Sequence, residues 1–127
     1  MTFASVAASR HSHTAQLDLK GRWTFWFLIR HSRGAVQSSN YENAIQLIDS
    51  FSTAEGFWSI WGHLKRPSEL PVNADYQVFR EGVRPVWEDK ANAHGGKWVV
   101  RLRKGIASRL WEHLVYKTSF LCFFNSV

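Results

Sequence analysis

The sequence predicts an α+β fold in which helices pack on one side of an antiparallel sheet. In chain order, the periodic segments are strand, strand, helix, strand, strand and helix, and none of them repeats. A chain of 127 residues forms one domain at most, and its 45% hydrophobic and 20% charged residues are ordinary for a globular protein. Seven Trp, nine Phe and three Tyr are unusual, because cores rarely need so many indoles.

The first two strands are expected near the N-terminal end of the folded part, which begins near Leu17. Residues 23–29 read WTFWFLI, a dense aromatic and β-branched run that favours a central strand. A polar loop containing glycine follows, and a second strand is expected around 42–51. Residues 1–16 show no periodicity and predict a disordered tail, although their Ser/Ala-rich composition without acidic residues also resembles an organelle transit peptide.

A helix is predicted to begin within the sequence STAE, residues 52–55. These residues fit a capping box, in which the Ser52 hydroxyl accepts a first-turn amide and Glu55 reaches back to the cap amide. Cations and a proline at 65–67 predict where the helix ends. Between these signals, apolar residues recur at helical spacing: Ala54, Phe57, Trp58, Trp61 and Leu64.

The second half of the chain repeats the strand and helix signals. DYQVFRE, residues 75–81, predicts a strand, and KWVVRLRK, residues 97–104, alternates strictly between two faces. One face of that predicted strand carries Trp98, Val100 and Leu102, and the other carries Lys97, Val99, Arg101 and Arg103. Residues 105–115 return to helical spacing, with a stripe formed by Ile106, Leu110, Trp111 and Leu114.

Charge and cysteine usage limit the classes of partner. A net charge of +6 and a pI near 9.9 favour polyanions, such as nucleic acid or an anionic lipid surface. The single cysteine, Cys122, excludes an intramolecular disulfide and a cysteine-rich metal site, as expected for a reducing compartment. No apolar run approaches the ~18 residues that span a bilayer, so no membrane partner is expected.

Catalytic signals are weak throughout the sequence. Six histidines are scattered without metal-ligand spacing, and no phosphate-binding loop or nucleophile elbow is present. The carboxylates of Asp75, Glu81, Glu88 and Asp89 are more typical of solvated loop charges than of a catalytic pair. The sequence therefore predicts a binding protein rather than an enzyme, with no metal and no cofactor.

One loop carries a more specific signal. VRPVWEDKANAHGGKW, residues 83–98, places Trp87 beside Glu88, and Tyr41 lies at the end of another loop. Loop aromatics stack on bases, and a carboxylate can accept two parallel hydrogen bonds from the N1–H and N2–H₂ edge of guanine. A positively charged base would add a cation–π term of ~0.5–2 kcal/mol per ring. The alternative is that Trp87 plugs the end of the sheet and Glu88 faces water.

Five ordered words extend this reading: WxFW, SxYExxI, FSTAEGFW, FxEGxRPxWED and GGKWxxRLRKG. Taken together, from about Leu17 to Val115, they resemble the eukaryotic translation initiation factor 4E family, whose members bind the 7-methylguanosine cap of mRNA. The chain is most similar to the type 2, 4E-homologous branch, because its first stacking position is Tyr41 and the loop between Trp26 and Tyr41 is long. The resemblance implies a curved sheet with helices on its convex face.

The resemblance also implies a cap site. The methylated guanine would lie between Tyr41 and Trp87, and Glu88 would hold its Watson–Crick edge. Lys97 occupies a position whose family counterpart contacts the cap phosphates. Arg101 shares a strand face with Lys97 and would act with it, although an edge charge in solvent explains Arg101 equally well. The implied nucleic-acid partner is capped mRNA.

A second surface is implied on the back of the sheet. In the family, a helix tryptophan there binds scaffold or repressor proteins that carry a tyrosine-x4-leucine-hydrophobic helix, and the matching residue is Trp58. Leu114 and Val115 lie where the family's second helix helps to form that groove, whereas Phe57 and Trp61 are expected in the core.

The chain departs from the family pattern at both ends. Leu17-Asp18-Leu19 replaces the usual His-Pro-Leu of the partner surface. After Val115, YKTSFLCFFNSV replaces the later strands and helix, so residues 17–115 are expected to be a partial cap-binding domain and 116–127 a divergent tail. An incomplete sheet has an unpaired edge, which predicts weak cap binding or marginal folding. We expect a cytoplasmic cap-binding protein that either initiates or represses translation; the alternative is a protein-interaction module, a decoy for initiation-factor partners, that has lost cap binding.

Overall fold

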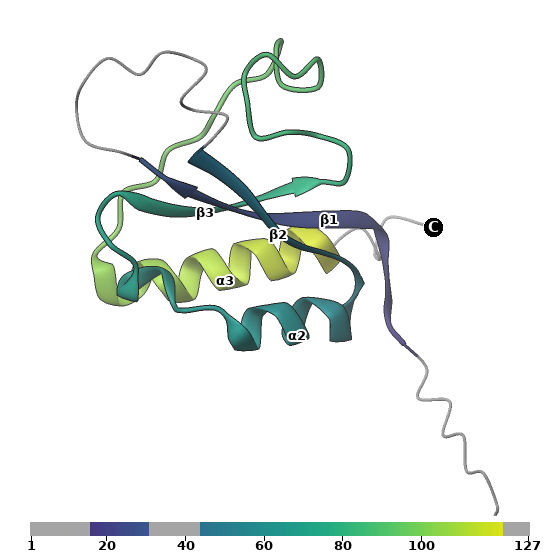
Figure 1. The fold of residues 1–127 in the computed structure, drawn as a ribbon. Helices are drawn as coiled ribbons and strands as arrows, with labels where there is room; N and C mark the ends of the chain where they lie inside the picture. The colour runs from purple at the N-terminus through teal and green to yellow at the C-terminus, as the bar shows by residue number, and fades with distance from the viewer. Residues whose placement is uncertain (1–15, 31–43, 121–127) are drawn as a thin grey trace, which may run out of the picture.

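The computed structural model describes residues 16–30 and 44–120, and these form the predicted α+β fold (Figure 1). Its elements are strand β1 (Asp18–Ile29), strand β2 (Ile45–Thr53), helix α2 (Ala54–His63), 3-10 helix η1 (Pro67–Glu69), strand β3 (Ala74–Arg80) and helix α3 (Lys104–Phe120). Both long helices lie on one face of a curved antiparallel sheet, which confirms the predicted layering.

The sheet has three strands in the order β2-β1-β3, so β1 is central as predicted. Both pairings are antiparallel; for example, Phe25 lies opposite Asp49 on β2 and Val78 on β3. β1 begins at Asp18, five residues before the predicted strand, and its pairing with β2 shifts register between Phe25 and Trp26. The sheet leaves the outer edges of β2 and β3 without a strand neighbour among the described residues.

An aromatic core joins the sheet to the helices. Phe25 and Phe57 are fully buried and Trp61 is 1% exposed, with ring centroids 6.0–6.4 Å apart. Trp58 remains 45% exposed. The predicted assignment of Phe57 and Trp61 to the core, with Trp58 at the surface, is therefore confirmed.

The start of α2 corrects the predicted cap. Thr53, not Ser52, is the N-cap residue, and its hydroxyl accepts a hydrogen bond from the Gly56 amide at 3.0 Å. The Glu55 carboxylate does not reach back to a cap amide; it accepts the Leu17 amide of β1 at 3.2 Å. Because β2 continues through Thr53, the helix starts one residue later than the capping-box pattern indicated.

The predicted strand at 97–104 was wrong. Residues 97–103 have no secondary structure, and no strand among the described residues pairs with them. Trp98 is 100% exposed and Val100 is 74% exposed, so the alternating apolar face has nothing to cover it. Alternation orders the side chains of a strand, but a strand also requires a neighbour that satisfies its backbone.

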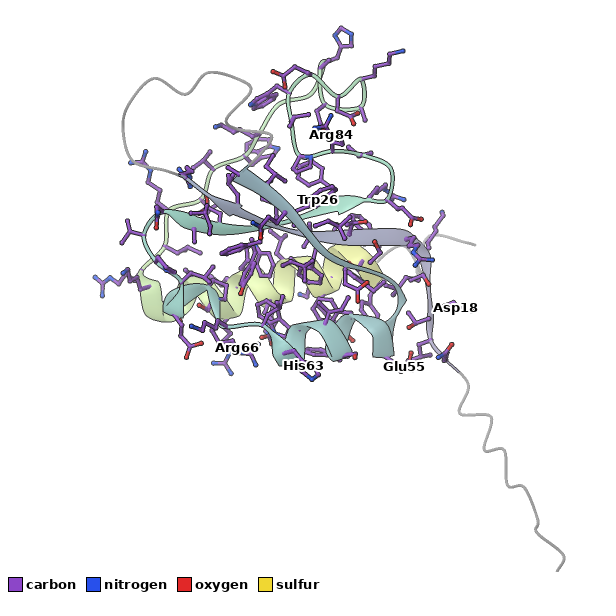
Figure 2. All side chains as sticks on the ribbon, viewed as in Figure 1. Asp18, Trp26, Glu55, His63, Arg66 and Arg84 are labelled. Carbon is purple, nitrogen blue, oxygen red and sulfur yellow. The ribbon has the colours of Figure 1, made fainter. Side chains whose placement is uncertain are left out.

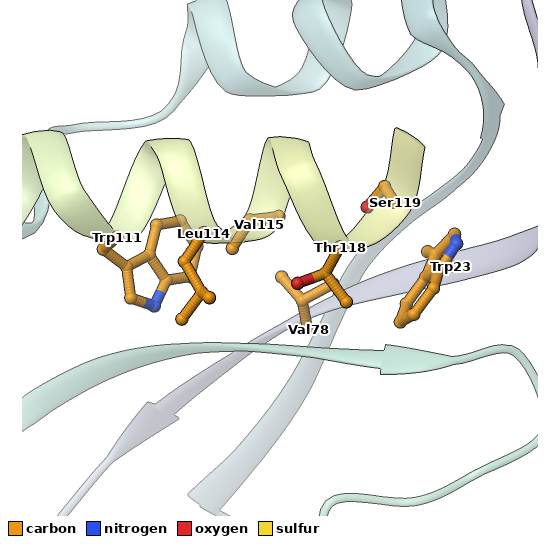
Figure 3. A pocket seen from close by; sticks show the side chains of 7 residues that line it. All are labelled: Trp23, Val78, Trp111, Leu114, Val115, Thr118 and Ser119. Carbon is orange, nitrogen blue, oxygen red and sulfur yellow. The ribbon is translucent and has the colours of Figure 1, made fainter. Parts of the chain in front are cut away.

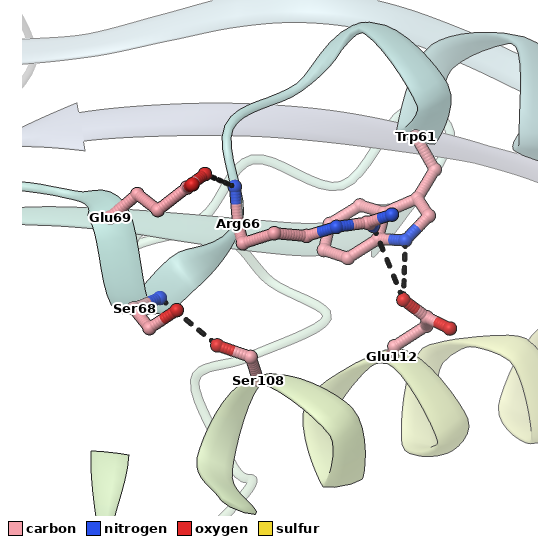
Figure 4. Close-up of polar contacts among 6 residues, drawn as sticks. All are labelled: Trp61, Arg66, Ser68, Glu69, Ser108 and Glu112. Atoms are coloured by element: carbon pink, nitrogen blue, oxygen red, sulfur yellow. Dashed lines mark hydrogen bonds and ion pairs between the residues drawn. The ribbon is translucent and has the colours of Figure 1, made fainter. Parts of the chain in front are cut away.

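Helix α3 is longer than predicted and is locked to α2 by polar contacts (Figure 4). It runs to Phe120, past Val115, at which the sequence predicted the tail to begin. Glu112 accepts hydrogen bonds from the Trp61 indole N–H at 2.7 Å and from the Arg66 guanidinium at 3.2 Å. The Arg66 guanidinium also lies over the Trp61 ring, 4.9 Å from its centroid. These contacts fix α3 across the end of α2.

Candidate functional site

The loop between β3 and α3 carries the motif that the sequence singled out. After Arg80 the chain turns at Gly82, whose φ of +83° is a conformation that favours glycine. The loop then anchors itself through Val86, which is 7% exposed, and through the buried Pro85. The loop lies on the side of the sheet opposite the helices, where Arg84 and Trp26 are also found (Figure 2).

Asp89 is the centre of the loop's hydrogen bonding. Its carboxylate accepts the backbone amides of Arg84 and Ala91, both at 2.9 Å. These two donors, followed by the nearby Arg84 charge, lower the pKa of Asp89 below its ordinary value, against a smaller opposing effect of desolvation. The charged form of Asp89 therefore closes the turn that presents Trp87 and Glu88.

Asn92 completes the bracing. Its side-chain amide donates to the carbonyls of Arg84 and Val86, each at 2.9 Å. Sequence reasoning missed both Asp89 and Asn92 as organisers of the loop. The signal was available, because Asp and Asn side chains commonly bond nearby backbone groups in turns.

Trp87 and Glu88 both lie at the surface. Trp87 is 60% exposed, and the neighbouring Val86 takes the buried position that the plug alternative had given to the indole. Glu88 is exposed as well, and no group among the described residues bonds to its carboxylate. The loop thus offers an aromatic face and an unengaged acceptor side by side.

A cavity of about 600 Å³ opens beside this indole. Trp87 and Lys97 both line it, and its floor is formed by Gln77 and Phe79 of β3. The structure therefore brings the predicted base-stacking residue and the predicted phosphate-binding residue to one cavity. Arg101 is exposed but does not line the cavity, and Tyr41 lies outside the described residues.

The second predicted surface is centred on Trp58. Its ring lies 4.9 Å from Phe57 and 5.7 Å from Tyr116 between centroids, and Tyr116 stacks on Phe120 at 4.1 Å. Tyr116 and Phe120 were missed because both lie in the segment expected to be a tail. The helical spacing continued past Val115, and that periodicity could have identified them.

The structure places the other two predicted groove residues away from Trp58. Val115 is 8% exposed and belongs to the core cluster. Leu114 is 64% exposed, but it lines a different cavity with Trp23 and Val78, between α3 and the sheet (Figure 3). Of the three predicted residues, only Trp58 lies beside the aromatic surface formed with Tyr116.

Neither a metal centre nor a membrane span is found in the described part of the chain. No group of three or more His, Cys, Asp or Glu side chains there could hold a metal ion. No helix among the described residues is long and apolar enough to cross a bilayer.

Comparison with known proteins decides the family. The model of the family described as eukaryotic initiation factor 4E matches residues 18–122. The chain belongs to this family. Membership of the 4E family, which consists of cap-binding translation initiation factors, confirms the resemblance seen in the sequence; the assignment to the 4E-homologous branch stays a prediction.

Curated relatives show how much of the family protein the chain represents. Eukaryotic translation initiation factor NCBP of Triticum aestivum is 46% identical over 97 residues, which are 76% of this chain and 41% of the relative. Initiation factor 4E-4 of Caenorhabditis elegans is 42% identical over 98 residues, 77% of this chain and 46% of the relative. The chain thus spans less than half the length of these 4E proteins.

Solved structures of the family share the fold. A complex of C. elegans eIF4E-3 with the 4E-binding protein Mextli and a cap analog matches with a TM-score of 0.76 and 28% identity, covering 87% of this chain and 61% of that one. Ascaris suum eIF4E-3 with an m2,2,7G cap matches with a TM-score of 0.74 at 28% identity and the same coverage.

Proposed function

We propose that this chain binds the 7-methylguanosine 5′ cap of mRNA and takes part in translation initiation or its repression, without chemistry on the ligand. The observation that carries the proposal is the half-exposed indole of Trp87 on a loop braced by Asp89 and Asn92. A stacking residue must be exposed to the base and yet fixed in position, and this loop meets both requirements. The 4E structures solved with cap ligands support the choice of ligand.

The proposal assigns a role to each residue of the site. Trp87 stacks on the methylated base, with Tyr41 as the second ring, and Glu88 accepts the two N–H groups of the guanine edge. Lys97 lies on the same cavity as Trp87 and contacts the phosphates; Arg101, which is exposed nearby in the sequence, adds to that charge. The positive charge of the methylated base adds a cation–π attraction that unmethylated guanine lacks.

Retention on 7-methylguanosine resin tests the proposal. Trp87→Ala should abolish retention, because stacking on an aromatic ring contributes ~1–3 kcal/mol per base. Trp98→Ala is the matched control: Trp98 is fully exposed and does not line the cavity, so retention should stay at the level of the unmodified chain. Equal retention by the Trp87→Ala variant would refute the cap site.

The choice of base edge needs a separate experiment. Glu88→Gln keeps the size of the side chain but replaces one acceptor oxygen by an N–H₂ donor that faces the guanine donors. We expect a loss of affinity of at least ~10-fold for a methylated cap analogue in a fluorescence titration, since an unpaired polar group costs ~1–3 kcal/mol. Unchanged affinity would remove Glu88 from the site.

A second candidate function is supported by the aromatic surface of Trp58 and Tyr116. An exposed indole flanked by a second ring suits a partner helix, because buried aromatic residues dominate many interfaces. The partner would be a scaffold or repressor protein with a tyrosine-x4-leucine-hydrophobic helix, and the solved complexes of a 4E protein with Mextli support this class of partner. Under this function alone, Trp87→Ala should leave partner pull-down unchanged, and the chain would act as a decoy without cap binding.

A further inference from the structure

A second cavity lies away from both proposed binding surfaces. It measures about 190 Å³ and opens between the last turns of α3 and the sheet (Figure 3). Its lining is mostly apolar: Trp23, Val78, Trp111, Leu114, Val115, Thr118 and Ser119. An apolar cavity of ~150 Å³ is already large enough to hold a benzene ring.

Two buried polar atoms at this cavity have no partner within the described residues. Ser119 is 1% exposed and Trp23 is 8% exposed. Neither the Ser119 hydroxyl nor the Trp23 indole N–H makes a hydrogen bond. Buried polar groups are normally paired, so an occupant of this cavity should bring a carbonyl acceptor as well as apolar side chains.

The chain itself supplies such an occupant. Ser119 and Phe120 are the last residues of α3, and the sequence continues LCFF at 121–124. Four extended residues reach ~13 Å, which covers a cavity lined by the residue two positions before the segment. The segment carries three large apolar side chains, and its backbone offers the carbonyl acceptors that Trp23 and Ser119 lack.

We propose that residues 121–124, which lie outside the described residues, fold back into this cavity and place a phenylalanine ring among its apolar side chains. The segment would then complete the core beneath β3, where the sheet has no further strand in the described part of the chain. It would also hold the end of α3, and with it Phe120, whose ring stacks on Tyr116. This role is separate from cap binding, and either can fail without the other.

The native Cys122 allows a direct test by disulfide trapping. Val78 lines the cavity from β3, so a Val78→Cys variant should form a disulfide with Cys122 within one molecule upon mild oxidation. A disulfide requires the two Cα atoms to approach within ~7 Å. Gln77→Cys is the matched control, because adjacent strand residues face opposite sides of the sheet, and it should react at least ~10-fold more slowly.

The outcomes separate the possible occupants. Mass mapping of a 78–122 disulfide in the monomer, lost when Phe123→Ala and Phe124→Ala are added, would support the proposal. A disulfide between two molecules would instead identify a second copy as the occupant and overturn it. Equal rates in the Gln77→Cys control, or no disulfide at all, would overturn it as well.

A measurement on the unmodified chain covers the case in which Val78→Cys does not fold. If the segment is docked, Cys122 should react with a thiol reagent at least ~10-fold more slowly in the native protein than in urea, because attack requires an accessible thiolate. Phe123→Ala with Phe124→Ala should remove this protection, whereas Asn125→Ala should not. A native thiol that reacts as fast as the unfolded one would show that the cavity is not filled by this segment.

Discussion

Glu112→Ala should be a severe destabilising substitution, although it removes a single surface-facing carboxylate. The Glu112 side chain is 27% exposed and accepts the N–H of an indole, Trp61, that is 1% exposed. Removing the acceptor leaves that N–H buried without a partner, which costs ~1–3 kcal/mol. The lost Arg66 ion pair adds at most ~1 kcal/mol, because the Arg66 side chain is 49% exposed and water screens the pair.

These terms give a loss of ~2–3 kcal/mol in the free energy of unfolding. For a domain of this size, each kcal/mol corresponds to ~4 °C in Tm, so we expect a fall of ~10 °C by circular dichroism. Glu112→Gln keeps an oxygen acceptor for the indole and should cost only ~1 kcal/mol, because a neutral acceptor makes a weaker hydrogen bond than a charged one. Arg66→Ala should cost no more than Glu112→Gln.

A double-mutant cycle identifies the cause. In a Trp61→Phe background there is no indole N–H to leave unpaired, so Glu112→Ala should cost less than ~1 kcal/mol there. If Glu112→Ala costs the same in both backgrounds, or if Glu112→Gln is as damaging as Glu112→Ala, the hydrogen bond to Trp61 is not the source of the stability.

Two further substitutions test the cap of α2 and the loop. Thr53→Ala should lower the free energy of unfolding by ~1 kcal/mol in urea titration, because its hydroxyl caps the Gly56 amide; Ser52→Ala should stay within ~0.5 kcal/mol. Asp89 has a pKa below its ordinary 3.8, so the loop should be fully braced above that pH and loosen as the pH falls through the lowered pKa. Cap-analogue quenching of Trp87 should follow this acid transition, and Asp89→Asn should abolish the transition; an unchanged pH profile would contradict the role of Asp89.

The parts of the fold that the sequence predicted correctly are those set by local periodicity. The central strand around Phe25 and the buried phases of α2, Phe57 and Trp61, follow from apolar side chains that one face must bury. The exposed position of Trp58 follows from the same helical phase. Each of these predictions depended on a residue's own element and needed no knowledge of a distant neighbour.

The failures have the opposite character, because each depended on what lies next to the segment. Residues 97–103 alternate as a strand should, but Trp98 has no neighbouring layer to pack against. Thr53 replaces Ser52 as the cap because β2 extends through it. Tyr116 was missed because the sequence pattern gave no sign that α3 would continue beneath Trp58. Tertiary context decided all three.

The two proposed surfaces are physically separate, and this has a measurable consequence. The loop that carries Trp87 lies on the side of the sheet opposite α2, which carries Trp58 (Figure 1). Trp87 and Trp58 share no contact and no hydrogen-bond partner among the described residues. Effects on stability should therefore add within ~0.5 kcal/mol when both are replaced by alanine.

The same separation should hold for binding. Trp58→Ala should leave retention on cap resin unchanged, and Trp87→Ala should leave partner pull-down unchanged. A loss of cap retention in the Trp58→Ala variant, with its Tm unchanged, would show that the surfaces communicate through the core that joins α2 to β3. In that case the aromatic contacts between Trp61, Tyr76 and Trp111 would be the place to look for the coupling, since they connect the helices to the strand from which the cap loop departs.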